Sequence, residues 1–306
     1  MGFSTQKTSE SNINHAIAGA ASGFITRFLS QPLDVVKIRF QLQVEPISRS
    51  HTSKYKSVSQ AFMLILKEEG PIALWKGHVP AQLLSITYGM TQFYSYNVFN
   101  QMFQVLQIKN WYHTTHFIAG AGAGSIATIV SFPFDTVRTR LVAQSSNHQV
   151  YNGILHSCRL IFRQESPKVF FSGLLPTLLQ IAPHTGLQFA FYNFFTDVYK
   201  KCTSDTNTNI YNSMLSGSCA GLLAKTIVYP FDLARKRLQI QGFEHGRKGF
   251  GKYFQCNGLM DCLKITVKEE SIQGLFKGLI PSQVKAVITT ALHFTVYEQV
   301  LLLIQM

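Results

Sequence analysis

Three basic residues, Arg27, Lys225 and Lys285, stand inside long apolar stretches of this 306-residue chain. A charge in such a stretch is costly, and residues of this kind usually belong to a functional site. Guanidinium and ammonium groups bind phosphate oxygens strongly. The three bases therefore indicate a central site for a phosphate or diphosphate group. The alternative left open is that each one reaches a membrane interface or pairs with an acid elsewhere in the chain.

A stripe of polar residues supports the same site. Three glycines, Gly77, Gly173 and Gly278, recur at equivalent places, and the positions seven, eleven and fifteen residues beyond each share one helix face. A face turned to lipid would be apolar, so this face predicts a polar cavity. A hydrogen bond inside the helix bundle remains the alternative for the two histidines. The stripe consists of Leu84, Tyr88, Gln92, Gln180, His184, Gln188, Lys285, Thr289 and His293.

Three aspartates close to the ends of apolar segments need basic partners. Each belongs to the same pattern, in which proline is followed two residues later by aspartate, then by a base and an arginine. An aspartate can pair with the base of its own copy or with the base of the neighbouring copy, and the second arrangement would form a ring able to open and close. Gln41 and Gln239 can hydrogen-bond across such pairs, whereas Val142 occupies the third equivalent position. The three copies are Pro32-Asp34-Lys37-Arg39, Pro133-Asp135-Arg138-Arg140 and Pro230-Asp232-Arg235-Arg237.

These residues recur because the chain consists of three copies of one unit, at 1–106, 107–204 and 205–306. Each copy contains two apolar segments long enough to cross a bilayer. We therefore expect an all-α membrane protein with six transmembrane helices, kinked at Pro32, Pro133 and Pro230. A pair of glycines four residues apart precedes each proline and predicts close helix packing within the bundle. The six segments are 15–40, 80–102, 114–141, 176–199, 211–238 and 281–304.

Three long polar loops connect the paired segments, and each is expected to carry a short amphipathic helix, clearest at 58–69 and 259–270. With their motif ends, the loops 37–77, 138–173 and 235–278 hold seven, five and nine of the 28 lysines and arginines. Positive charge is retained on the side from which a membrane protein inserts. The loops are therefore expected on that side, and both termini on the other.

The remaining sequence features exclude other classes of protein. The polar first dozen residues predict neither a secretory signal nor a presequence. Five cysteines without a CxxC pair predict free thiols, and no metal or cofactor site is expected. The motifs of zinc proteases, serine hydrolases and P-loop enzymes are missing, so an enzyme is not expected. A net charge of +13 could suggest nucleic-acid binding, but the bases are divided among the loops. A passive pore remains an alternative to a transporter.

The repeated pattern resembles the signature of the mitochondrial carrier family. After the proline motif, that signature continues with an acid, a glycine, an aromatic residue, a base and a glycine, as in Glu69-Gly70 to Trp75-Lys76-Gly77. The second copy departs at Ser166 and Ser172, and the third copy departs at Ser271. The resemblance covers essentially the whole chain.

The resemblance implies a monomeric six-helix bundle in the mitochondrial inner membrane, with the loops in the matrix and both termini toward the intermembrane space. It implies alternating access for a small phosphorylated anion, with cardiolipin as a lipid partner. Adenine nucleotides and coenzyme A are alternatives that remain open for the identity of this anion. Substrate contacts fall on Leu84-Ser85, Gln180-Ile181 and Lys285-Ala286. The matrix gate is the aspartate ring. The cytoplasmic gate falls on Tyr96, Asn97, Tyr192, Asn193, Tyr297 and Glu298, where no complete ion-pair motif is present.

Overall fold

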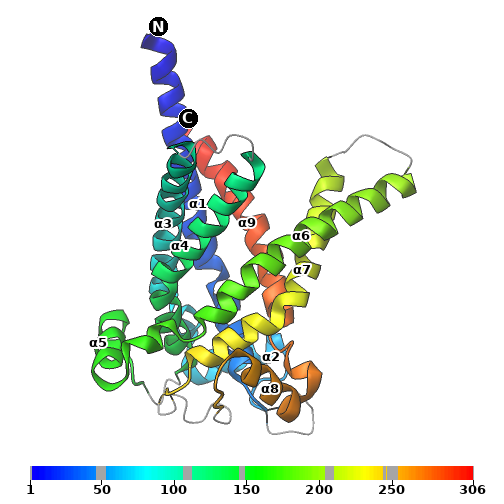
Figure 1. Ribbon diagram of the computed structural model, residues 1–306. Coiled ribbons are helices and arrows are strands. Elements are labelled where there is room, and N and C mark those ends of the chain that lie inside the picture. The colour runs from blue at the N-terminus through cyan, green and yellow to red at the C-terminus, as the bar shows by residue number, and fades with distance from the viewer. Residues whose placement is uncertain are drawn as a thin grey trace.

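The computed structural model describes residues 2–45, 53–105, 112–144, 149–203, 210–243, 246 and 254–305, and within them every regular element is a helix. Two long helices come from each repeat, and the N- and C-terminal ends lie at the same end of the molecule (Figure 1). This end is called the outer end below, and the opposite end the inner end. The long helices are α1 (Gly2–Leu42), α3 (His78–Val105), α4 (Tyr112–Ala143), α6 (Leu174–Thr203), α7 (Ile210–Gln239) and α9 (Leu279–Gln305).

Each of the six expected apolar segments lies within one of these helices. The helices α1, α4 and α7 continue past Pro32, Pro133 and Pro230, so these prolines do not end them. Their sequence stays apolar and compatible with a helix on both sides of the proline. By length and composition, two helices of the described chain pass the test for a membrane span, over Thr115–Ala143 and Leu279–Ile304.

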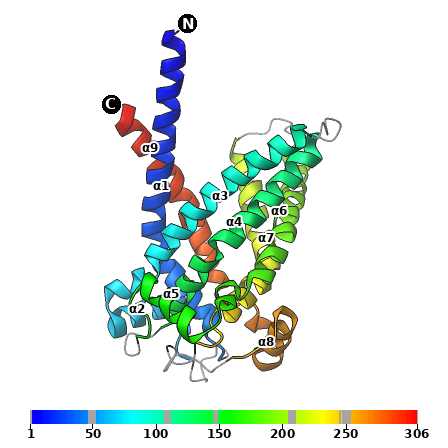
Figure 2. The same ribbon diagram turned by 60° about the vertical axis from the view of Figure 1, so that its left-hand side comes forward.

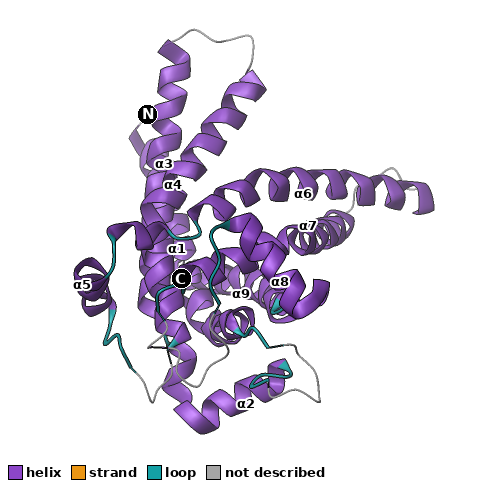
Figure 3. Cartoon of the chain, turned by 60° about the horizontal axis from the view of Figure 1, so that its bottom comes forward, coloured by secondary structure: helices purple, strands orange, loops and turns teal. Residues whose placement is uncertain are grey.

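Short helices gather at the inner end, around the outside of the bundle (Figures 2 and 3). The helix predicted at 58–69 is α2 (Val58–Glu69), and the one predicted from residue 259 is α8 (Leu259–Gly274). The second repeat supplies α5 (Ile154–Gln164) at the corresponding place. The 3-10 helices η1 (Pro71–Trp75) and η3 (Pro167–Phe171) follow α2 and α5.

Local sequence explains where α2 begins and ends. The Ser57 side chain accepts a hydrogen bond from the backbone N–H of Gln60, which satisfies one of the free donors of the first turn. Gly70 follows the helix with φ of 80°. One face of α2 buries Ala61 and Ile65 against the end of α1. This contact forms part of a buried cluster, which shows that the compact apolar core lies at the inner end.

Gly77, Gly173 and Gly278, called the marker glycines below, lie at the start of α3, α6 and α9, where each of these helices packs against the neighbouring repeat. All three have positive φ, between 75° and 84°. A Cβ added at Gly173 would lie 2.7 Å from the carbonyl oxygen of Arg235, and one added at Gly278 would lie 3.1 Å from that of Lys37. Because glycine has no side chain, the starts of α3, α6 and α9 can approach the backbone that carries the basic residues of the next repeat.

Four of the six paired glycines before the prolines do not make the close helix contacts that the sequence predicts, whereas Gly124 and Gly217 have a tyrosine of the neighbouring helix within 4 Å of an added Cβ. A Cβ added at Gly19, Gly23, Gly120 or Gly221 would meet no other heavy atom within 4 Å. The tight contact at this level is instead made by Gly122, where an added Cβ would lie 3.0 Å from Phe99 Cε2. The expectation was wrong for these four glycines because the helices diverge toward the outer end (Figure 1).

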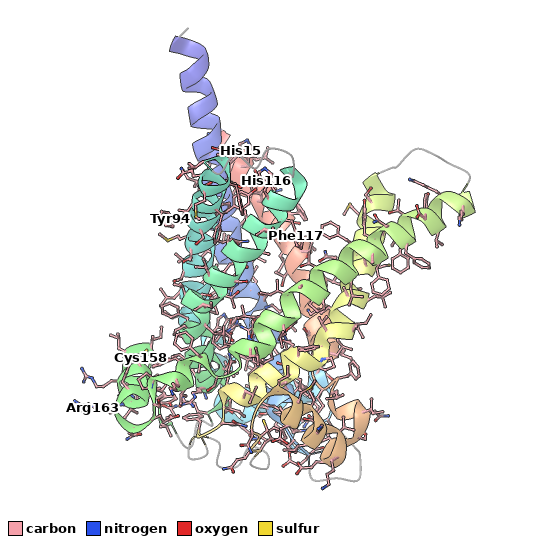
Figure 4. All side chains as sticks on the ribbon, viewed as in Figure 1. His15, Tyr94, His116, Phe117, Cys158 and Arg163 are labelled. Carbon is pink, nitrogen blue, oxygen red and sulfur yellow. The ribbon has the colours of Figure 1, made fainter. Side chains whose placement is uncertain are left out.

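Large apolar side chains cover the outside of the long helices. On α3, Met90, Phe93 and Tyr94 are 70 to 74% exposed, and Phe117 on α4 is exposed to a similar degree. Tyr94 and Phe117 lie on the outer half of the bundle (Figure 4). Apolar surface of this extent marks a face that contacts a membrane or a partner in a folded protein.

Candidate functional site

The three aspartates form ion pairs from one repeat to the next at the inner ends of α1, α4 and α7. Asp34 accepts from Arg138 at 2.5 Å and Asp135 accepts from Arg235 at 2.8 Å. Asp232 accepts from Lys37 at 2.6 Å, which closes the circle. We call these six residues the inner ring. Of the two pairings that the sequence leaves open, the structure contains the one between neighbouring repeats.

Additional donors strengthen the inner ring unevenly. Asp34 also accepts from Lys285 at 2.6 Å. Asp135 also accepts from Lys236, at 3.0 and 2.9 Å to its two oxygens, and from Gln239 at 2.5 Å. Among the described residues, Asp232 forms an ion pair with Lys37 alone and also accepts from the Gln41 amide at 3.1 Å. Each glutamine donates to the predicted aspartate, but within the described residues no hydrogen bond joins it to the base of that pair, Lys37 or Arg235. The pair of Lys37 and Asp232 has the fewest charged partners.

A second set of buried arginines ties each repeat to the next. Arg39, Arg140 and Arg237 each bind the glutamate of their own repeat with two nitrogens, at 2.5 to 3.0 Å, and these glutamates are Glu69, Glu165 and Glu270. The remaining guanidinium nitrogen, Nε, donates to a carbonyl of the following repeat, at Val142, Gln239 or Gln41 respectively. These arginines are almost fully buried. They connect the short inner helices to the inner ring.

The glutamate sites differ between repeats in their second base. Lys76 binds Glu69 at 2.6 Å, and Lys277 binds Glu270, but Ser172 takes the equivalent place in the second repeat. Burial by itself would raise the pKa of Glu69, but hydrogen bonds and positive charge from Arg39 and Lys76 outweigh it and lower the pKa to about 2. Glu69 is therefore ionised at neutral pH.

A cavity of about 490 Å³ lies on the outer side of the inner ring. Asp135 and Arg235 of the ring contribute to its wall, together with Arg27 and Thr128. Arg27 donates to the carbonyl of Ala81 at 2.9 Å and still lines the cavity. The residues of the predicted stripe and contact points that line the cavity are Leu84, Ser85, Tyr88, Gln180, Ile181 and His184.

Gln180 is the most informative of these residues. Its side-chain oxygen is buried and has no hydrogen-bond partner in the part of the chain that the structure describes. A buried acceptor without a partner is costly. A ligand that carries an amino group would satisfy it.

The other predicted contact residues lie outside the lining of this cavity. Lys225 donates to the carbonyl of Ser282 at 2.6 Å, and Lys285 binds Asp34. His293 lies within hydrogen-bond distance of the Ser22 hydroxyl, at 3.0 Å, which corresponds to the alternative left open for it. Gln92 and Thr289 are half-buried, and Gln188 is exposed.

At the outer end, two of the three predicted gate tyrosines contact histidines. Tyr297 lies 2.7 Å from His15 Nδ1, and Tyr96 lies 3.0 Å from His116 Nδ1. Asn97, Asn193 and Glu298 are exposed, and Tyr192 is half-buried. No ion pair joins these gate positions within the described residues.

Several site residues were not found from the sequence. Lys236 lies between two motif bases and has no basic counterpart in the other copies, so the repeat gave no reason to choose it. The bonds between Arg39, Arg140 and Arg237 and their glutamates could have been found, because both partners recur at fixed offsets. Cys158, Cys219, Cys256 and Cys262 are free thiols as expected, and the side chain of Cys202 lies outside the described residues.

Comparison with known proteins assigns the sequence to a family. The family model described as mitochondrial carrier protein matches residues 8–106, 110–202 and 206–306. The chain is 46% identical to the human mitochondrial thiamine pyrophosphate carrier over 92% of this chain and 89% of that protein. It is 44% identical to the protein of that name from Bos taurus, over 94% and 92%. It is 36% identical to mitochondrial thiamine pyrophosphate carrier 1 of Phaeosphaeria nodorum, over 92% and 90%.

The family model matches three consecutive segments of the chain. Each of them contributes one aspartate and one base to the inner ring. Proteins of this family are transporters, so the chain is not an enzyme, and no cofactor is indicated for it. The chain belongs to the mitochondrial carrier family.

Proposed function

We propose that this chain carries thiamine pyrophosphate across the mitochondrial inner membrane by alternating access. The observation that carries the proposal is its 44 to 46% identity to mammalian thiamine pyrophosphate carriers over most of both chains. We further propose that transport is an exchange with nucleotides or other phosphorylated anions.

The chemistry of the cavity suits such a ligand. Thiamine pyrophosphate joins a diphosphate to a cationic thiazolium ring and an aminopyrimidine. Arg27, Lys225 and Lys285 are proposed to bind the diphosphate. Gln180 has a free buried oxygen that suits the amino group, and Tyr88 offers an aromatic face in the same cavity. The other proposed contacts are Leu84, Gln92, Ile181, His184, Gln188, Thr289 and His293.

The inner ring is proposed to be the matrix gate, with Gln41 and Gln239 donating to two of its three aspartates. In the state described here, ion pairs hold the ring shut, while the helices diverge toward the outer end (Figures 1 and 2). The cytoplasmic gate is proposed at Tyr96, Asn97, Tyr192, Asn193, Tyr297 and Glu298. The helix bends that move the two gates are proposed at Pro32, Pro133 and Pro230.

We propose six membrane spans formed by α1, α3, α4, α6, α7 and α9, in one bundle of three repeats divided near residues 106 and 204. Exposed apolar side chains such as Phe93 and Phe117 support lipid contact along these helices. The basic loops support a matrix location for the inner end, with both termini toward the intermembrane space. A monomer is proposed, with cardiolipin among its lipids and no nucleic-acid partner.

The second candidate is a carrier of adenine nucleotides or coenzyme A. The bases of the cavity and the amide of Gln180 also suit an adenine ring attached to phosphates. The identity of 44 to 46% to mammalian thiamine pyrophosphate carriers favours thiamine pyrophosphate over this second candidate.

Ligand-dependent stability of the purified protein tests the proposal. A ligand that binds the folded chain raises its unfolding temperature by mass action. Thiamine pyrophosphate is expected to raise it more than equal concentrations of ATP or coenzyme A, and thiamine is expected to have no effect because it lacks phosphate. A larger shift with ATP or coenzyme A would replace the assignment by the second candidate.

A further inference from the structure

Two hydrogen bonds join neighbouring repeats at the outer end, far from the inner ring. His15 on α1 contacts Tyr297 on α9 at 2.7 Å, and their rings stack with centroids 6.3 Å apart. Tyr96 on α3 contacts His116 on α4 at 3.0 Å. We call them the His–Tyr contacts. Figure 4 places His15 and His116 at this end of the bundle.

The His–Tyr contacts occupy equivalent positions in the repeat. Each histidine stands four residues before the first glycine of its pair, and each tyrosine stands nineteen residues beyond its marker glycine. The third interface has Tyr192 on α6 opposite Ser213 on α7, and no hydrogen bond joins these two residues in the described structure. An added Cβ at Gly217 would lie 4.0 Å from the Tyr192 ring, so the two helices are close here. The third repeat is thus a natural variant without the contact.

The helices pack closely between repeats and loosely within them, and the His–Tyr contacts lie at the closely packed interfaces. The pairs α1 with α9, α3 with α4 and α6 with α7 pack along their lengths, whereas the two long helices of one repeat touch at few positions. The gaps at the outer end therefore lie within repeats. In the alternating access proposed above, closure of that end would move the tyrosine-bearing helices relative to their present partners. A hydrogen bond across the present pairing favours the open arrangement.

We propose that His15 and His116 are positioning residues that hold Tyr297 and Tyr96 on the neighbouring repeat and stabilise the state open at the outer end. This inference rests on the alternating access proposed above. One hydrogen bond of usual net strength shifts a two-state equilibrium by roughly 2- to 12-fold. The two contacts together set how readily the outer end closes, and Ser213 leaves the third interface easier to change.

Two variants test the proposal from opposite directions, and a third is the control. His15→Ser with His116→Ser copies the third repeat into the other two. Ser213→His adds the missing histidine opposite Tyr192. The control is His156→Ser, because His156 is an exposed histidine on α5 at the inner end.

The readout is the distance between spin labels at Val105→Cys on α3 and Lys201→Cys on α6, in a chain whose five native cysteines are alanine. Both positions are exposed, near the outer ends of helices that diverge in Figure 1. Electron–electron double resonance is recorded in liposomes with saturating thiamine pyrophosphate, so that both states are populated.

The double serine variant is expected to increase the ratio of the short-distance to the long-distance population by about fivefold or more. Ser213→His is expected to decrease it by about twofold or more, and His156→Ser to leave it unchanged. An unchanged ratio of the two populations in both test variants, or changes of the ratio in the opposite directions, would overturn the proposal. Failure of the parent chain to exchange labelled thiamine pyrophosphate would instead contradict the proposed substrate, and the effect of the variants would then be read from the two populations recorded without ligand.

Discussion

Lys285 Nζ lies 2.6 Å from Asp34 Oδ1, although the two residues are 251 positions apart in the sequence. Lys285 was expected to bind the ligand, and in this state it binds the inner ring. Asp34 keeps Arg138 as a second partner at 2.5 Å. A phosphate that draws Lys285 away would therefore remove one of the two bases from Asp34 without leaving the carboxylate unpaired.

Lys285→Ala is expected to lower thiamine pyrophosphate exchange by about tenfold or more, because a hydrogen bond to a charged group contributes about 1.5 to 3 kcal/mol. The protein should still fold, since Arg138 continues to neutralise Asp34. Uptake into liposomes and the unfolding temperature measure both effects. Lys264→Ala removes an exposed lysine of α8 as the matched control. Undiminished uptake by the Lys285 variant would remove this residue from the binding site.

Reversal of the pair of Lys37 and Asp232 tests the inner ring. Each single change, Lys37→Asp or Asp232→Lys, leaves like charges together and is expected to lower exchange by about tenfold or more. The double variant should recover most of the activity, because within the described residues no second base forms an ion pair with Asp232. A double variant that folds but remains as inactive as the single variants would argue against a ring of simple ion pairs.

The pair of Asp135 and Arg235 provides the contrast. The double variant Asp135→Arg with Arg235→Asp should not restore activity, since Asp135 also binds Lys236 and Gln239. An arginine at position 135 would face Lys236 across the interface. Full recovery in this double variant would show that the additional donors have no role in holding the ring shut.

The three repeats explain how much of this site could be predicted from sequence. Asp34, Asp135 and Asp232 recur with their bases, and a threefold arrangement brings each beside the next repeat. Lys285 and Lys236 have no basic counterparts in the other repeats, so only the folded structure shows that they share the ring aspartates. The positions of the long helices followed from apolar length and from the prolines inside them.

The contacts of the paired glycines also depend on the folded structure and could not be predicted from their spacing. A glycine pair permits close approach but does not require it, and the divergence of the helices leaves space beside Gly19 and Gly120 in this state. The partners of His15 and His116 also depend on how the outer ends tilt. Neither relationship is contained in the spacing of residues along one helix.

Glu69 should make stability depend on pH. Its pKa is lowered from 4.5 to about 2 in the folded chain, so its contribution is fully present above about 4.5 and is lost as the pH falls toward 2. Glu69→Gln should lower the unfolding temperature at pH 7 and flatten its pH dependence between 5 and 2, in about the range where the two pKa values lie. Thermal unfolding in detergent across this pH range measures the effect.

The neighbouring glutamate is the control for this experiment. The Glu68 side chain is 45% exposed and pairs with Lys54 on the surface, so Glu68→Gln should change the unfolding temperature little. Equal losses in the two variants at pH 7 would mean that the buried contact with Arg39 has no special weight.

Ser271 holds a backbone conformation that suits glycine. Its φ is 62° and its ψ is −179°, close to the values at Gly70, which occupies the same place in the first repeat. Non-glycine residues in this region carry about 1 to 3 kcal/mol of strain. Ser271→Gly should therefore raise the unfolding temperature, by about 2 to 4 °C for each 1 kcal/mol released.

Ser166 offers the matched comparison, because it replaces the same glycine in the second repeat with φ of −89°. Ser166→Gly should give no gain, and the added freedom of the unfolded chain should lower stability slightly. Similar gains at both positions would show that the strain at Ser271 is not the cause.

Exchange in liposomes tests the central claim most directly. Purified protein is reconstituted in vesicles loaded with unlabelled thiamine pyrophosphate, and uptake of labelled thiamine pyrophosphate is followed against an excess of thiamine pyrophosphate, ATP, coenzyme A or thiamine. The account predicts saturable exchange that thiamine pyrophosphate competes best and thiamine does not affect. Exchange inhibited chiefly by ATP or coenzyme A, or no exchange at all, would contradict it.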